Sequence, residues 1–280
     1  MINVLRADIY RLTRDKALYA TFGAVILMAA ILVLPIGGGG GVLGLPVNLY
    51  FDNDGPAWLD GFHAATVLLP ASSALTFFLI PVVVIAGRGH FADGAVRNSL
   101  TTGISRTRLY LATWIISSAL TVVMFVVYLG SGIGLATLAH GPGYWLWTQR
   151  IVGWYKLPEG TVYSLLMLLA LTSIAVFLGF AIRKTAVAMA IYVLFSIVPL
   201  LLLFFGTAFF FYDGSRLPYR VQNLLVYTSP FLNVWFPTMA DFDPAHSIPS
   251  EVWLPPTVSA AWIASTTLAG IYRFSRMAVQ

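Results

Sequence analysis

Six stretches of this 280-residue chain contain no Asp, Glu, Lys, Arg or His, and each approaches the length of a membrane-crossing helix. Such a helix needs about 20 apolar residues, because each residue adds about 1.5 Å along the axis. The third stretch is long enough to tilt or to project beyond the bilayer, whereas the sixth is short. The sequence therefore predicts one all-α polytopic membrane domain over residues 1–280, with six transmembrane helices at about 17–36, 64–87, 109–139, 161–182, 186–212 and 257–272.

The composition argues against a soluble domain. Hydrophobic residues make up 59% of the chain and charged residues only 10%, whereas soluble domains carry about 25% charged residues. A chain with so few charges could not cover a water-facing surface. Cysteine is absent, which excludes disulfides, thiolate metal sites and a cysteine nucleophile.

Positive charges are distributed unevenly between the two ends of the expected helices. Six spans place both termini on one side, and that side receives 12 of the 16 Lys and Arg residues. Cytoplasmic loops are enriched in Lys and Arg, so we expect both termini and the 88–108 loop in the cytoplasm. This topology accounts for the net charge of +5, and no basic stripe interleaved with exposed aromatics indicates nucleic-acid binding.

The first sixteen residues have an amphipathic helical pattern. Leu5 and Ile9 recur at i and i+4, while Arg6 and Arg11 lie elsewhere around the helix. We expect residues 1–16 to form an interfacial helix on the inner membrane surface. Its basic residues would meet membrane lipids of negative charge, each contributing about 1 kcal/mol near the surface.

The six stretches offer no recognisable catalytic chemistry. Proton-coupled carriers usually keep an ionisable group at membrane depth, and these stretches have none. Motifs for zinc hydrolases, serine hydrolases and phosphate-binding loops are also absent. Sodium coordination by carbonyls and hydroxyls remains open. If the protein uses ATP, another chain has to bind it.

Closely spaced glycines lie inside the third predicted helix, and prolines lie inside the second and fifth. Gly130, Gly132 and Gly134 in the third stretch permit close packing between helices, or alternatively a flexible pivot. Internal prolines remove a backbone donor and kink helices. We expect such kinks in the second and fifth stretches, at Pro70, Pro81 and Pro199.

The loop between the second and third stretches carries the most specific sequence. Phe91, Ala95 and Leu100 can form the apolar side of a short helix that closes near Gly103. Ser105 then provides an N-cap for the third span. A short amphipathic helix in a cytoplasmic loop is an element that can fill a groove on a partner.

Over Asp93–Leu111, an acid and Gly are followed by a basic residue, Asn, Ser-Leu, Gly-Ile-Ser-Arg and then Tyr-Leu. This order of residues resembles the loop of ABC-2 type transporter permeases, close to the bacterial peptide, bacteriocin-immunity and drug-export subgroup. A lysine usually follows in that family, where this chain has Ala112-Thr113. Leu5–Leu12 resembles the family's amphipathic connecting helix, and Tyr227–Phe231 resembles its outer segment before the last span.

The resemblance implies a permease subunit of an ATP-driven exporter in the cytoplasmic membrane of a bacterium. The chain itself would be no enzyme and hold no cofactor, because ATP and Mg would bind to a separate ATP-binding cassette subunit. A second permease copy or a homologous permease would complete the pathway. The 88–108 loop would contain the coupling helix, with these residues docking on the ATPase: Phe91, Asp93, Gly94, Arg97, Asn98 and Leu100.

Several alternatives stay open at this point. Residues 213–256 form either re-entrant helices on the outer side or an ordinary extracellular loop. The lack of ionisable groups in the spans suggests an apolar or amphipathic cargo, such as a peptide, a lipid-like molecule or a drug-like molecule. A passive channel or secondary carrier is one rival. A membrane-embedded enzyme with catalytic residues in outer loops is the other, using Asp52, Asp54, Asp60 and His63, or Asp241, Asp243 and His246.

Overall fold

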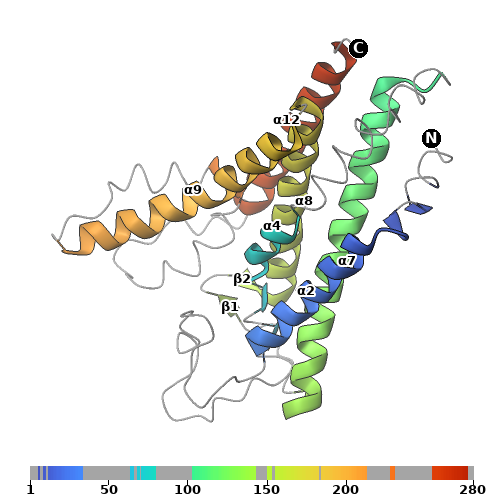
Figure 1. The fold of residues 1–280 in the computed structure, drawn as a ribbon. Helices are drawn as coiled ribbons and strands as arrows, with labels where there is room; N and C mark the ends of the chain where they lie inside the picture. The colour runs from blue at the N-terminus through green and yellow to red at the C-terminus, as the bar shows by residue number, and fades with distance from the viewer. Residues whose placement is uncertain are drawn as a thin grey trace.

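The computed structural model of the chain is built mainly from long helices (Figure 1). It describes residues 6, 9–10, 12–33, 64–65, 68–69, 71–79, 103–142, 150–152, 155–182, 184–212, 228–230 and 254–276. The elements in these residues are α2 (Lys16–Val33), η2 (Ser72–Ala74), α4 (Leu75–Phe78), α7 (Arg106–His140), β1 (Arg150–Val152), β2 (Tyr155–Lys156), α8 (Leu157–Ala181), α9 (Thr185–Tyr212) and α12 (Leu254–Arg276).

Three helices in the described part are long and apolar enough to cross a membrane, namely α2, α7 and α8. They coincide with the first, third and fourth predicted stretches, so the chain is a membrane-embedded, predominantly helical protein. The fifth and sixth stretches are also helical, as α9 with 28 residues and α12 with 23. That these two helices and the second stretch cross the bilayer stays a prediction.

The second predicted stretch is an interrupted helix where it is described. Residues 64–65, 68–69 and 71 are helical, a 3₁₀ segment follows at Ser72–Ala74, and α4 continues from Leu75. The 3₁₀ segment begins two residues after Pro70 in the sequence, and the kink expected at this proline stays a prediction. Pro70 and Pro81 themselves fall outside the described residues.

The predicted helical fold is confirmed, and one short strand pair accompanies the helices. β1 and β2 pair antiparallel between α7 and α8, with Arg150 opposite Lys156 and Val152 opposite Tyr155. This short ladder forms where the chain reverses direction between two helices. Ile151 and Val152 are β-branched and suit extended backbone, and antiparallel pairing provides partners for the backbone groups of the reversal.

Two helices begin earlier than the sequence suggested. α8 begins at Leu157 and contains Pro158 in its first turn, and α12 begins at Leu254 and contains Pro255 and Pro256. We expected α12 to begin after these prolines. A proline is tolerated in the first turn because the N–H groups there have no helical acceptor. α8 ends at Ala181 and α9 begins at Thr185, so a short connection joins these two helices.

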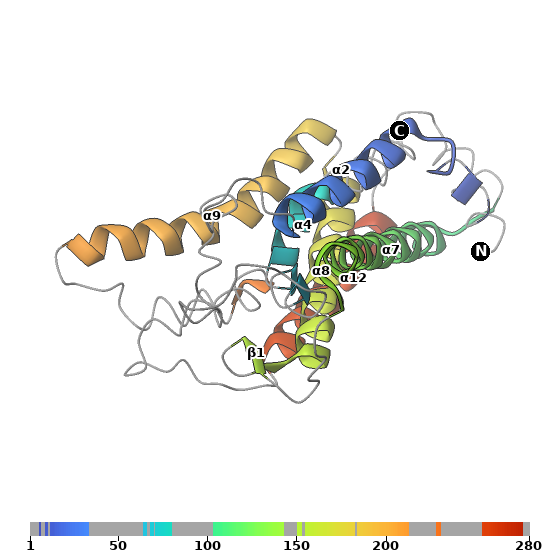
Figure 2. The same ribbon diagram turned by 90° about the horizontal axis from the view of Figure 1, so that it is seen from below.

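α8 is the most enclosed helix of the bundle. In the 18-residue apolar segment of each helix, 67% of the residues are buried in α8, compared with 33% in α7 and 22% in α2. α12 and α7 pack along α8, α2 packs along α7, and α9 meets α8 near its start and then projects away from the other helices (Figures 1 and 2). Large apolar side chains remain exposed on the outer helices, including Leu27, Val126 and Leu194, as expected of surfaces that face lipid.

The glycine run in α7 is used for close packing at one position. A Cβ placed on Gly132 would collide with the side chain of Leu68, so the absence of a side chain lets the interrupted helix approach α7. Among the described residues, nothing lies within 4 Å of a Cβ placed on Gly130 or Gly134. The packing interpretation of these glycines is therefore confirmed for Gly132.

We predict that Gly132→Leu lowers the thermal stability of the purified protein, because the added side chain forces Leu68 away from α7. Overpacking of this kind costs about 1–3 kcal/mol. Thermal unfolding in detergent, followed by size-exclusion chromatography, measures the loss. Gly134→Leu is the matched control and should retain the wild-type midpoint, whereas equal losses in both variants would contradict the assigned contact.

Candidate functional site

The structure describes the point where the 88–108 loop enters the bundle, although not the loop's predicted docking residues. Those residues, Phe91, Asp93, Gly94, Arg97, Asn98 and Leu100, fall in the part of the chain that is not described. The described chain resumes at Gly103, which has a φ of 84°. Glycine adopts this left-handed conformation readily, and it commonly does so just beyond a helix end. The predicted helix closure near Gly103 is compatible with this geometry.

Ser105 begins α7 as predicted. Its backbone is extended, with φ −67° and ψ 146°, and its side-chain oxygen accepts a hydrogen bond from the backbone N–H of Arg108 at 3.4 Å. Such a cap satisfies one of the first N–H groups of a helix. The sequence interpretation of Ser105 as the N-cap is confirmed, and the end of the loop is fixed to the first turn of α7.

The N-terminal segment agrees with a surface helix where it is described. Arg6 and Ile9 are helical and exposed, whereas Leu5 and Arg11 are outside the described residues. The segment ends before α2, where the carboxylate of Asp15 accepts a hydrogen bond from the backbone N–H of Ala17 at 2.9 Å. An acidic cap at this position stabilises the start of α2.

Two arginines near the loop bind the C-terminal carbonyls of neighbouring helices. Arg106 in α7 donates from Nη1 to the carbonyl of Ser275 in α12 at 3.1 Å. Arg273 in α12 donates from Nη2 to the carbonyl of Ala181, the last residue of α8, at 3.2 Å. The last carbonyls of a helix lack helical partners and carry partial negative charge, so guanidinium groups stabilise them. We call these two contacts the arginine clamp.

An aromatic cluster fills the space between the three helix ends. The ring of Phe180 in α8 makes edge contacts with Tyr110 in α7, at 5.1 Å between centroids, and with Phe274 in α12, at 4.9 Å. Tyr110, Phe180 and Phe274 are all buried. A Cβ on Gly270 would collide with the Tyr110 ring, so this glycine leaves the room in which the ring lies against α12.

Deeper in the bundle, hydroxyl groups connect the same three helices. Ser173 in α8 accepts a hydrogen bond from the indole N–H of Trp114 in α7 at 3.1 Å. Its oxygen also lies 2.8 Å from the hydroxyl of Thr266 and 3.2 Å from that of Thr267, both in α12. We call Trp114, Ser173, Thr266 and Thr267 the hydroxyl seam. Because it joins three helices through one buried oxygen, it fixes their relative positions.

The seam continues through two further contacts. The hydroxyls of Thr121 in α7 and Thr172 in α8 lie 2.7 Å apart and are both buried. The Tyr110 hydroxyl donates to the backbone carbonyl of Thr266 at 3.4 Å. These contacts extend the connection between α7 and its neighbours toward the middle of the bundle and back toward the arginine clamp.

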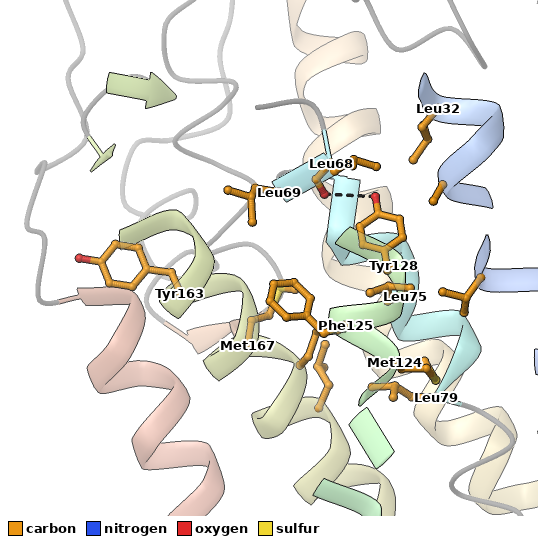
Figure 3. Close-up of a cluster of buried hydrophobic side chains, with 14 of the residues drawn as sticks. Leu32, Leu68, Leu69, Leu75, Leu79, Met124, Phe125, Tyr128, Tyr163 and Met167 are labelled. Atoms are coloured by element: carbon orange, nitrogen blue, oxygen red, sulfur yellow. Dashed lines mark hydrogen bonds between the residues drawn. The ribbon is translucent and has the colours of Figure 1, made fainter. Parts of the chain in front are cut away.

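A second set of hydroxyls binds backbone carbonyls of the interrupted helix, and Figure 3 shows one of these contacts, between Tyr128 and Leu68. The Tyr128 hydroxyl donates to the Leu68 carbonyl at 3.1 Å. Ser164 donates to the Leu69 carbonyl at 3.2 Å, and Tyr192 donates to the Thr76 carbonyl at 3.3 Å. The donors come from α7, α8 and α9. Each donates to a backbone carbonyl close to the 3₁₀ segment, and those of Leu69 and Thr76 also accept a hydrogen bond from Ser72 and Leu79 respectively.

Sequence reasoning missed most of these contacts. Serine and threonine in apolar helices can hydrogen-bond to the carbonyl one turn earlier, and Thr113, Thr121 and Thr172 do so. A hydroxyl in the sequence therefore does not reveal whether it also reaches a neighbouring helix. The recurrence of Thr113, Ser117 and Thr121 every four residues was the available signal for a polar face on α7.

No family model matches the chain, and no curated protein matches it either. The assignment of the site consequently depends on the sequence motif and on the contacts of this chain.

We predict that Ser173→Ala destabilises the bundle, because it removes the oxygen shared by Trp114, Thr266 and Thr267. The expected loss is about 1–2 kcal/mol, because several hydrogen bonds are removed and one such bond between membrane helices contributes about 0.6 kcal/mol on average. Thermal unfolding in detergent or nanodiscs measures it. Ser265→Ala is the control, since Ser265 lies exposed on α12 and bonds within its own helix. A midpoint for Ser173→Ala as high as that of Ser265→Ala would contradict the seam.

We also predict that Tyr128→Phe destabilises the protein, because the Leu68 carbonyl loses the hydroxyl that donates to it. The loss is about 1 kcal/mol. Tyr272→Phe removes the same atom from an exposed ring on α12 and should leave the unfolding midpoint unchanged. The prediction is wrong if the two Tyr→Phe variants unfold together with the wild type.

Proposed function

We propose that the chain is the transmembrane permease subunit of an ATP-driven exporter of the ABC-2 type. The observation that carries the proposal is the Asp93–Leu111 motif, which resembles the coupling loop of those permeases. The loop ends at a capped helix start, and Arg106, directly after the cap, binds α12. A coupling loop needs such an attachment, because its displacement has to reach the membrane helices.

In this function the chain transmits movement and catalyses no bond chemistry. ATP and Mg bind between two ATPase subunits, and closure of those subunits displaces the coupling helix. The loop then moves α7 through Ser105, and the membrane helices reorient around a pathway shared with a second permease, which is either another copy or a homologue. The alternation exposes the cargo site to one side of the membrane and then to the other.

The buried polar groups support an apolar or amphipathic cargo. In the described helices, the buried polar groups of the side chains are mainly the hydroxyls of serines, threonines and tyrosines, and the Asp, Glu, Lys and Arg residues lie near helix ends. Hydroxyls and carbonyls offer hydrogen bonds without a fixed charge, which suits peptides with few charges and lipid-like or drug-like molecules. A strongly charged cargo would be left without a counter-charge in such surroundings.

The distribution of charge supports the proposed orientation with both termini in the cytoplasm, while the bacterial cytoplasmic membrane is proposed from the resemblance of the loop motif alone. The start of α7, the end of α8 and the end of α12 meet at one end of the bundle. This end carries Arg106, Arg108, Lys184, Arg273 and Arg276. A basic end of this kind faces the cytoplasm under the positive-inside rule.

Co-purification tests the proposal directly. The chain, expressed with its neighbouring reading frames and extracted in mild detergent, should retain an ATPase subunit that contains a phosphate-binding loop. A passive channel or secondary carrier would transport without such a subunit.

Substitution of the aspartates and histidines in the outer loops tests the alternative of an enzyme with catalytic residues there. These substitutions should leave transport intact, whereas such an enzyme would lose its activity.

We predict that Arg97→Glu reduces the amount of co-purified ATPase, because charge reversal opposes docking of the coupling helix. Quantitative mass spectrometry of the purified complex measures the ratio of the two subunits. Arg150→Glu is the matched control, because it makes the same change on β1, between α7 and α8. Membrane insertion should be preserved in both variants. Wild-type ATPase recovery with Arg97→Glu would exclude this residue from the docking surface.

A further inference from the structure

We propose that Arg106 and Arg273 are positioning residues that make α7, α8 and α12 respond as one body to displacement of the coupling loop. α9 lies outside this body, so the relative motion occurs between α8 and α9. The inference depends on the proposed function for the source of the displacement. The rigidity of the three-helix unit can be measured without it.

The first step is the short path from the loop to the clamp. Ser105 caps α7, and Arg106 follows it directly in the chain. A guanidinium in the first turn of α7 is opposed by the dipole of its own helix, but the carbonyl of Ser275 at the end of α12 stabilises it. The Arg106 guanidinium therefore connects the end of the loop to α12. A displacement of the loop end acts on α7 and α12 together.

The second step connects α12 to α8. Arg273 binds the last carbonyl of α8, one turn before the end of its own helix. Phe180 is held between Tyr110 and Phe274 by two edge contacts. The polar contacts set the direction of the helix ends, and the packed rings resist sliding because interiors at this density have little free volume.

The third step is the hydroxyl seam, which joins the same helices at a second level. Ser173 lies about two turns before the end of α8, so the seam and the arginine clamp are about 12 Å apart along that helix. Two connected levels prevent the three helices from rotating independently about a single contact. A displacement at the Ser105 end of α7 then moves α7, α8 and α12 together.

The fourth step is the different attachment of α9. The Tyr192 hydroxyl donates to the Thr76 carbonyl of the interrupted helix, and the buried Ser196 hydroxyl donates within α9. α9 packs on α8 near the α9 start, Phe195 makes an edge contact with Trp262 of α12 at 5.2 Å between centroids, and the helix then diverges from the bundle (Figures 1 and 2). α9 therefore takes part in neither the arginine clamp nor the hydroxyl seam, and we assign the relative motion to its apolar contacts with the unit.

Distances between spin labels test this assignment, and the absence of cysteine makes labelling specific. One cysteine pair is placed within the unit at Ile115 and Leu268, which are 39% and 67% exposed. A second pair joins Leu268 to Leu194 in α9, which is 58% exposed. In nanodiscs with the co-purified ATPase, ATP and Mg under arrested hydrolysis should leave the first distance unchanged and shift the second.

Variants show whether the arginines carry the response. Arg273→Ala should broaden the Ile115–Leu268 distance distribution and abolish the nucleotide-driven shift of the second pair. Arg273→Lys keeps the charge and should give a narrower distribution than Arg273→Ala and part of the wild-type shift. Arg276→Ala is the matched control, since Arg276 stacks on Tyr272 at 4.2 Å on the same helix. Arg106→Gln provides a second test at the other contact and is used if Arg273→Ala does not fold.

The possible failures are distinguishable. If no ATPase co-purifies, the proposed function fails, while the width of the Ile115–Leu268 distribution in the isolated permease still tests the clamp. The positioning role is overturned if nucleotide shifts both pairs equally. It is also overturned if Arg273→Ala and Arg106→Gln leave the distribution narrow and the nucleotide response intact.

Discussion

Inside a bilayer the polypeptide has no water to bond, so each polar group has to find a partner within the protein. This constraint explains most of the contacts in the bundle. Tyr128, Ser164 and Tyr192 bind carbonyls beside the 3₁₀ segment, and the arginine clamp binds carbonyls at two helix ends. In the described residues, the buried side-chain oxygens left without a partner are those of Thr76, Ser118 and Ser259.

The same constraint explains the central position of α8. Three of its buried hydroxyls reach three different neighbours: Ser164 the interrupted helix, Thr172 α7 and Ser173 α12. Most of the other residues after the first two turns are apolar and lie on all sides of the helix, which is typical of a helix buried among others. α8 thereby fixes the relative positions of elements that are far apart in the sequence.

Local features of the fold could be predicted from the sequence, whereas contacts between distant segments could not. Apolar length indicates the helices, and the position of Ser105 indicates the cap of α7. The predicted sixth span begins at residue 257, whereas α12 begins at Leu254, because Pro255 and Pro256 are accepted in its first turn. Gly132 could not be separated from Gly130 and Gly134, because only the position of Leu68 distinguishes them. The arginine clamp was hidden for a similar reason: charge placement located Arg106 and Arg273 at one end but could not reveal their carbonyl partners.

The length of α7 has a consequence for how the protein senses its membrane. With 35 residues α7 is about 50 Å long, against about 30 Å of hydrocarbon. A thinner or thicker bilayer is accommodated by a change in tilt. Since α7 is bound to α8 and α12 at two levels, the three helices tilt together and the position of Ser105 changes with them. We therefore expect the acyl-chain length of the lipids to change the tilt of the three-helix unit, and with it the position of the α7 start to which the coupling loop is joined.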